Sequence, residues 1–103
     1  MIKVSVLYPK SDGKRFDLDY YCAEHMRIVK DCLGDACKKI EVDAGLSGAA
    51  PGSDAPYFAM GHMLFDSVDE FQNAFGPHVD TIMSDIPNYT NVEPVVLVSE
   101  VKA

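Results

Sequence analysis

Residues 17–33 read DLDYYCAEHMRIVKDCL and decide the fold. At about 100° per residue, one side of this stretch collects Leu18, Tyr21, Cys22, His25, Val29, Cys32 and Leu33. Asp17 before the stretch is a good N-cap, and Gly34 after it suits the left-handed residue that ends many helices. The pattern therefore predicts an amphipathic helix whose apolar side faces a core.

His25 lies in the middle of this apolar side, where a leucine would serve a solid core. Two interpretations stay open. The imidazole is either a structural group bonded to a backbone carbonyl, or a general acid or base beside a cavity that holds a small molecule. Its ordinary pKa of about 6.5 suits proton transfer near neutral pH. An unpaired buried polar group costs ~1–3 kcal/mol, so both interpretations require a hydrogen-bond partner.

Short aliphatic and β-branched runs predict four strands, at residues 2–8, 38–46, 57–65 and 92–101. Charged and aliphatic residues alternate in 38–46, which indicates an edge strand, and the Gly- and Pro-rich stretch 48–56 is a long loop. Ser67 and Glu70 form a capping box before a second amphipathic helix. Pro77 should break that helix.

The order strand, helix, strand, strand, helix, strand predicts an α+β fold in one domain, residues 1–103. The simplest solution is a ferredoxin-like βαββαβ sandwich, a four-stranded antiparallel sheet with two helices on one face. The first, third and last strands carry apolar residues on both sides, yet helices cover only one. Apolar surface left in water costs about 25 cal/mol per Å². We therefore expect a homodimer in which two sheets face each other.

Composition limits the classes of partner. The net charge of −7 argues against nucleic acid and anionic membranes. No apolar run approaches the ~20 residues that a bilayer requires, no charged-then-apolar leader is evident, and the three cysteines lack C-x-x-C spacing, so we expect a cytoplasmic protein. Without H-x-x-x-H, paired cysteines, G-x-G-x-x-G or a P-loop, we predict neither a metal nor a bound cofactor.

Aromatic residues are candidates for a pocket wall, in which a tyrosine hydroxyl orients a phenolic or carbonyl substrate; as an alternative, they are plain core. His62 faces either this pocket or the dimer interface, and Asp85 and Asn88 are expected to fix their own turn. The candidate catalytic residue is His25. The candidate substrate-binding residues are Tyr8, Tyr57, His62, Phe65, Asp85, Asn88 and Tyr89.

Five segments, IKVSVLYP, DYYCAEHM, PGSDAPY, FDSVDEF and DIPNYTNVEPVV, together resemble the EthD family, named for ethyl tert-butyl ether degradation, of the dimeric α+β barrel superfamily. The resemblance spans nearly the whole chain and implies the same fold and the face-to-face dimer. The histidine of the family's His-Met pair corresponds to His25, and the family's D-x-x-N-Y-T turn begins at Asp85. Where the family usually has proline after His-Met, this chain has Arg27.

The resemblance also implies a range of activities, because family members are commonly called reductases or oxidoreductases and related barrels include cofactor-free monooxygenases, isomerases and polyketide cyclases. The leading hypothesis is a small enzyme or accessory protein of oxidative catabolism or secondary metabolism. It would perform oxidoreductase-type or cofactor-free chemistry on a small hydrophobic aromatic or carbonyl compound, with His25 transferring a proton. A non-catalytic protein that binds small molecules or assists an oxygenase, and a structural dimer without a ligand, are the alternatives.

Overall fold

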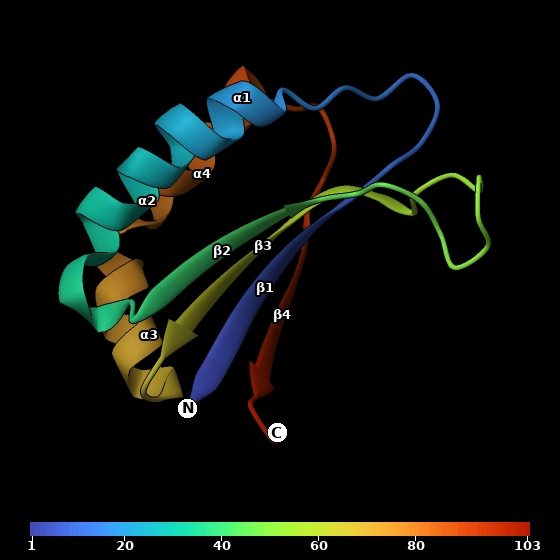
Figure 1. Ribbon diagram of the computed structural model, residues 1–103. Coiled ribbons are helices and arrows are strands. Elements are labelled where there is room, and N and C mark those ends of the chain that lie inside the picture. The colour runs from blue at the N-terminus through green and yellow to red at the C-terminus, as the bar shows by residue number, and fades with distance from the viewer.

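A computed structural model describes residues 1–103 and contains one antiparallel sheet with every helix on the same face (Figure 1). The strands are β1 (Ile2–Pro9), β2 (Lys39–Ala44), β3 (Tyr57–Phe65) and β4 (Val95–Glu100), in the order β2-β3-β1-β4. The predicted α+β, ferredoxin-like class is confirmed, and β2 is an edge strand as expected. None of the helices has the length and apolar character that crossing a membrane requires.

The first helical segment runs from α1 (Leu18–Tyr20) through a π-helical turn, η1 (Tyr21–His25), into α2 (Met26–Leu33). Its predicted ends are confirmed. The Asp17 side chain accepts a hydrogen bond from the Tyr20 backbone N–H at 3.1 Å, and Gly34 follows the helix with φ of +58°. A short 3₁₀ turn, η2 (Gly34–Ala36), leads to β2.

The π-helical turn changes which side chains face the core. The Met26 N–H bonds to the Tyr21 carbonyl, one residue further back than in an α-helix. The placement of Cys22 on the buried side is wrong, because Cys22 is exposed and Met26 is buried instead. The wider turn shifts side-chain directions away from the 100° spacing, which explains the difference.

The second helical segment consists of α3 (Val68–Phe75), a 3₁₀ turn η3 (Gly76–His78) and α4 (Val79–Ser84). The Ser67 hydroxyl accepts from the Glu70 N–H at 3.1 Å, and the helix is interrupted at Pro77, both as predicted. A last 3₁₀ turn, η4 (Ile86–Asn88), connects α4 to β4.

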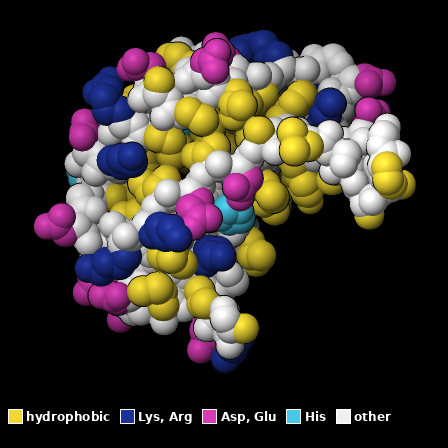
Figure 2. Space-filling model, viewed as in Figure 1, with side chains coloured by type: hydrophobic (Ala, Val, Ile, Leu, Met, Phe, Trp, Pro, Cys, Tyr) yellow, Lys and Arg dark blue, Asp and Glu magenta, His cyan; other side chains and the backbone are white.

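The two faces of the sheet differ. Ile2, Val4 and Tyr8 of β1 point into the core beneath the helices. By strand alternation and register, the opposite face combines apolar residues with a polar group that includes Ser5, Asp43 and His62. No helix covers this face, and Figure 2 shows hydrophobic side chains along the open side of the sheet, beneath the loop that projects from its end.

Candidate functional site

The imidazole of His25 is paired with a carboxylate. His25 ends the π-helical turn and is only 4% exposed, and its Nδ1 lies 2.9 Å from Oδ2 of Asp85. Asp85, itself 7% exposed, lies between α4 and η4. The required hydrogen-bond partner is therefore a side-chain carboxylate 60 residues away along the chain, and not a backbone carbonyl.

Two further donors hold Asp85. The Tyr20 hydroxyl donates to Oδ1 at 2.7 Å and the Asn88 side-chain amide donates to the same oxygen at 2.9 Å. Burial by itself would raise the pKa of Asp85, but the hydrogen bonds from Tyr20, Asn88 and His25 keep this pKa below its ordinary value. The carboxylate is therefore ionised at neutral pH.

His25 is neutral at neutral pH. Burial lowers the pKa of His25 below its ordinary value, and the hydrogen bond and charge of Asp85 offset only part of this effect. A neutral imidazole facing an ionised carboxylate carries its proton on Nδ1 and donates it to Asp85. The other nitrogen, Nε2, then keeps a free electron pair, and the Tyr89 hydroxyl lies 3.5 Å from it, a long contact.

Aromatic rings surround this nitrogen. The hydroxyls of Tyr8 and Tyr89 lie 2.8 Å apart, and Tyr21 stacks on the imidazole with ring centroids 5.5 Å apart. Burial raises the pKa of both Tyr8 and Tyr89, so both hydroxyls stay protonated and can donate hydrogen bonds. A base and two hydroxyl donors thus lie together in apolar surroundings.

A cavity of about 210 Å³ lies between the sheet and the α3–α4 segment. Its apolar walls include Val4, Val6 and Met63 from the sheet and Phe71, Phe75 and Met83 from the helices. His25 and the hydroxyl-bearing Tyr8 also line this cavity, and no charged side chain does. An engineered cavity of ~150 Å³ holds benzene, so a molecule with one ring fits this volume.

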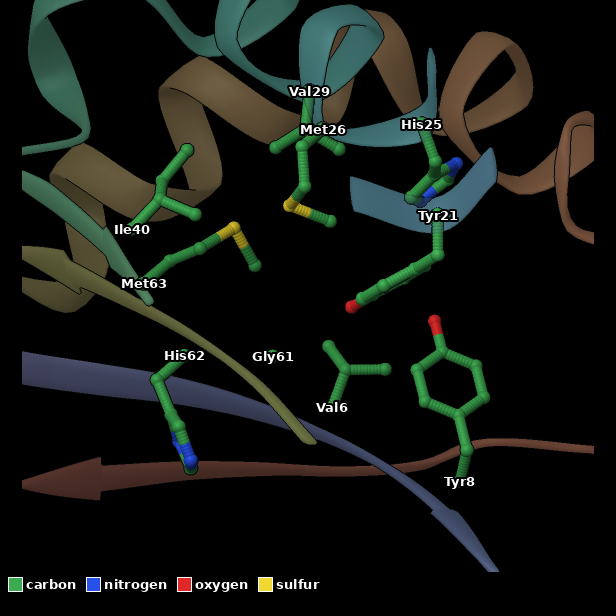
Figure 3. Close-up of a pocket in the computed structure, with 10 residues that line it drawn as sticks. All are labelled: Val6, Tyr8, Tyr21, His25, Met26, Val29, Ile40, Gly61, His62 and Met63. Atoms are coloured by element: carbon green, nitrogen blue, oxygen red, sulfur yellow. The ribbon is translucent and has the colours of Figure 1, made fainter. Parts of the chain in front are cut away.

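A second, smaller cavity of about 30 Å³ adjoins His25 on the β3 side (Figure 3). Met26, Val29 and Ile40 form part of its wall, and Gly61 forms part of its floor. A Cβ atom on Gly61 would overlap the Tyr21 hydroxyl, so the close approach of this tyrosine requires glycine.

The structure brings together most of the predicted site. His25, Asp85, Asn88, Tyr8 and Tyr89 form one connected group. Asn88 acts inside its own turn, as expected, but it also holds the carboxylate that reaches His25. No group of three or more His, Cys, Asp or Glu side chains has a spacing that would hold a metal ion.

Two predicted residues lie elsewhere, and a third, His62, borders the small cavity but does not turn its ring into it. Phe65 is fully buried in the core, and Tyr57 borders neither cavity beside His25. The ring of His62 points away from the small cavity (Figure 3), toward Ser5 on the uncovered face of the sheet, with Nδ1 2.8 Å from the serine hydroxyl. The Nε2 of His62 is 3.5 Å from Asp43.

Sequence reasoning missed Tyr20 and Tyr21. An ideal helix puts Tyr20 on the polar side, yet its hydroxyl reaches the buried carboxylate of Asp85. Tyr21 was expected on the apolar side but without any relation to the imidazole on which it stacks. The available signal was the adjacent pair of tyrosines one helical turn before His25, since tyrosine combines an apolar ring with a polar tip.

Comparison with known proteins agrees with the resemblance. The family model described as EthD domain matches residues 14–93. The crystal structure of an EthD-like protein from Ralstonia eutropha JMP134 has 44% identity and a TM-score of 0.91, and the match covers 96% of this chain and 89% of that one. No curated protein matches this chain.

Two more distant structures share the fold alone. An EthD family protein from Bacillus halodurans C-125 is 15% identical, with a TM-score of 0.68 and 99% of each chain covered. A protein of unknown function from Thermobifida fusca YX, described as dimeric and ferredoxin-like, is 16% identical, with a TM-score of 0.62, and the match covers 97% of this chain and 90% of that one.

Proposed function

We propose that this chain, which belongs to the EthD family, catalyses proton transfer on a small, uncharged, mostly apolar carbonyl or phenolic compound. One observation carries the proposal: a neutral histidine, His25, held through Nδ1 by an ionised carboxylate, lines an apolar cavity of about 210 Å³. A base poised in this way takes protons efficiently near neutral pH.

The chemical step uses groups that lie within the site. Nε2 of His25 takes a proton from the carbon next to a substrate carbonyl, and the resulting imidazolium is stabilised by Asp85 at 2.9 Å. The enolate oxygen accepts a hydrogen bond from the Tyr8 hydroxyl, which lines the cavity and is held by the Tyr89 hydroxyl at 2.8 Å. The imidazolium then returns the proton to the same carbon or to another one. All atoms and charges balance without a further reagent.

Oxidoreductase-type chemistry can start from the same step. Removing a proton converts a ketone into an enolate and a phenol into a phenolate, and both are electron-rich species that dioxygen, as the oxidant, can attack. Proton removal by His25 is therefore the common first step for both classes of reaction.

The test follows exchange of protons for deuterium. The protein is incubated in D₂O with a panel of uncharged ketones that carry one ring, and NMR measures the loss of the proton signal next to the carbonyl. We expect exchange with wild type and at least a 100-fold slower rate with His25→Gln, within the usual contribution of a general base. Tyr57→Phe, which lies outside both cavities, should exchange like wild type. Binding without exchange would indicate a non-catalytic binding protein instead.

We also propose that the chain forms a homodimer through the uncovered face of its sheet. Strand β4 is an edge strand, and its Val95 and Leu97, which share the uncovered face with Ser5, are 50% and 54% exposed. Exposed aliphatic side chains in such a row are costly in water, and a second copy is the simplest cover. The related Thermobifida fusca fold, described as dimeric, supports this assembly.

A further inference from the structure

We infer that the two cavities beside His25 are one binding site, divided by the side chain of Met63, that selects ketones carrying one uncharged ring and a short alkyl group. The inference rests on the proposed function, because it names the substrate class of the same site.

The wall between the cavities contains one adaptable side chain. Four residues line both cavities: Val6, Tyr8, His25 and Met63. Tyr8 and His25 are fixed by the hydrogen bonds described above, and Val6 is branched at Cβ and sits on a central strand. Met63 has three rotatable side-chain bonds and is only partly buried. Movement of Met63 is therefore the simplest way to join the two volumes.

The two volumes differ in what they can hold. The larger cavity, about 210 Å³, accepts a single ring, whereas the smaller, about 30 Å³, has the volume of one water molecule or methyl group. Because His25 and Tyr8 line both, a ring in the larger cavity would bring an attached carbonyl to these two residues. The alkyl group beyond the carbonyl would then enter the smaller cavity, with its first carbon beside the base. An alkyl phenyl ketone has these three parts in this order.

The lining selects against charged ligands. Neither cavity is lined by a Lys, Arg, Asp or Glu side chain, and the ionised carboxylate of Asp85 lies directly behind the imidazole. A carboxylate ligand would lose its hydration without gaining a cationic partner, and Asp85 would repel it. The ligand class is therefore neutral.

The size of the smaller cavity limits the alkyl chain. Its floor cannot move away, because Gly61 on the central strand β3 lies against the Tyr21 hydroxyl. Met63 is the adaptable side chain that lines both cavities, so a longer alkyl chain would enter the space where the Met63 side chain now lies. Replacing Met63 by alanine should therefore change the preferred chain length without changing the ring that fits.

The experiment measures binding of acetophenone, propiophenone and butyrophenone by calorimetry, with benzoate as the charged comparison. Wild type should bind acetophenone at least tenfold more tightly than butyrophenone, the usual discrimination for a methylene group that does not fit an apolar pocket. Met63→Ala should reverse this order. Met83→Ala, which enlarges only the larger cavity, should keep it. Benzoate should not bind.

Each outcome decides between the two proposals. An unchanged order of affinities in Met63→Ala, a reversal in Met83→Ala as well, or no binding of any ketone to wild type would overturn the inference. Deuterium exchange that shows no dependence on chain length would also overturn it, yet leave the proposed function standing. Selective binding without exchange would retain the site and reject catalysis. If Met63→Ala does not fold, Met63→Val provides a milder enlargement and the same comparison.

Discussion

The pH dependence of stability tests the charge of the buried imidazole. The pKa of His25 in the folded protein lies below its ordinary value of about 6.5, which we take for the unfolded chain. As the pH falls below about 6.5, the unfolded chain therefore binds more protons than the folded one. The free energy of unfolding then decreases by up to ~1.4 kcal/mol per pH unit, until the pH falls below the pKa of folded His25.

The assay is urea unfolding at intervals from about pH 8 to about pH 5, with wild type and His25→Gln compared at each pH. At pH 8 the variant should be less stable by ~1.5–3 kcal/mol, because the buried carboxylate of Asp85 loses a hydrogen bond. The free energies of unfolding of the two proteins should converge toward acid. Only wild type has a His25 that stays neutral in the folded state while the unfolded chain takes up a proton. The pKa of Asp85 is also lowered, but that stability is lost only as the pH falls below about 3.8, outside this window.

Parallel curves would mean that His25 has the same pKa in both states. Curves that diverge toward acid would mean that the folded protein holds a charged imidazole. Either result would refute the assignment of His25 as a neutral base.

Three further substitutions test the supporting structure. Tyr20→Phe removes a 2.7 Å donor from Asp85 and should lower the free energy of unfolding in urea unfolding at neutral pH. Gly61→Ala forces a methyl group against the Tyr21 hydroxyl and should cost ~1–3 kcal/mol in the same assay. Leu97→Lys places a charge on the uncovered face of β4 and should yield monomers in sedimentation equilibrium.

Each has a matched control. Tyr57→Phe should leave stability within ~0.5 kcal/mol, and a loss like that of Tyr20→Phe would show that the bond to the carboxylate is not the cause. In a Tyr21→Phe background the hydroxyl that meets the new methyl group is absent, so an equal loss from Gly61→Ala in that background would contradict the steric argument. Val68→Lys, on an exposed helix position, should leave the oligomeric state unchanged. A dimeric Leu97→Lys protein would place the interface elsewhere.

Local patterns predict the secondary structure well because their causes are local. The cap at Asp17, the capping box at Ser67 and the break at Pro77 depend on a few neighbouring residues, and all three are present in the structure. The strand 57–65 was predicted with its observed bounds, since a continuous apolar run fits a central strand.

The site depends on features that periodicity cannot express. A spacing of 100° per residue assumes a regular α-helix and cannot represent a π-helical turn. It therefore places Cys22 on the buried side, where the structure has Met26 instead. The bond between His25 and Asp85 joins residues from two helical segments, and only the packed fold brings them together. The face to which His62 points depends on strand register, which the sequence of β3 alone does not define.

The position of the proton on His25 tests the central claim most directly. Nitrogen NMR of protein labelled at histidine distinguishes the two ring nitrogens, and His25→Gln identifies the signals of His25. We predict a neutral ring at neutral pH, with the proton on Nδ1 facing Asp85 and none on Nε2, which lies 3.5 Å from the Tyr89 hydroxyl. A proton on Nε2, whether on a neutral or a charged ring, would leave the cavity without a base and contradict the account.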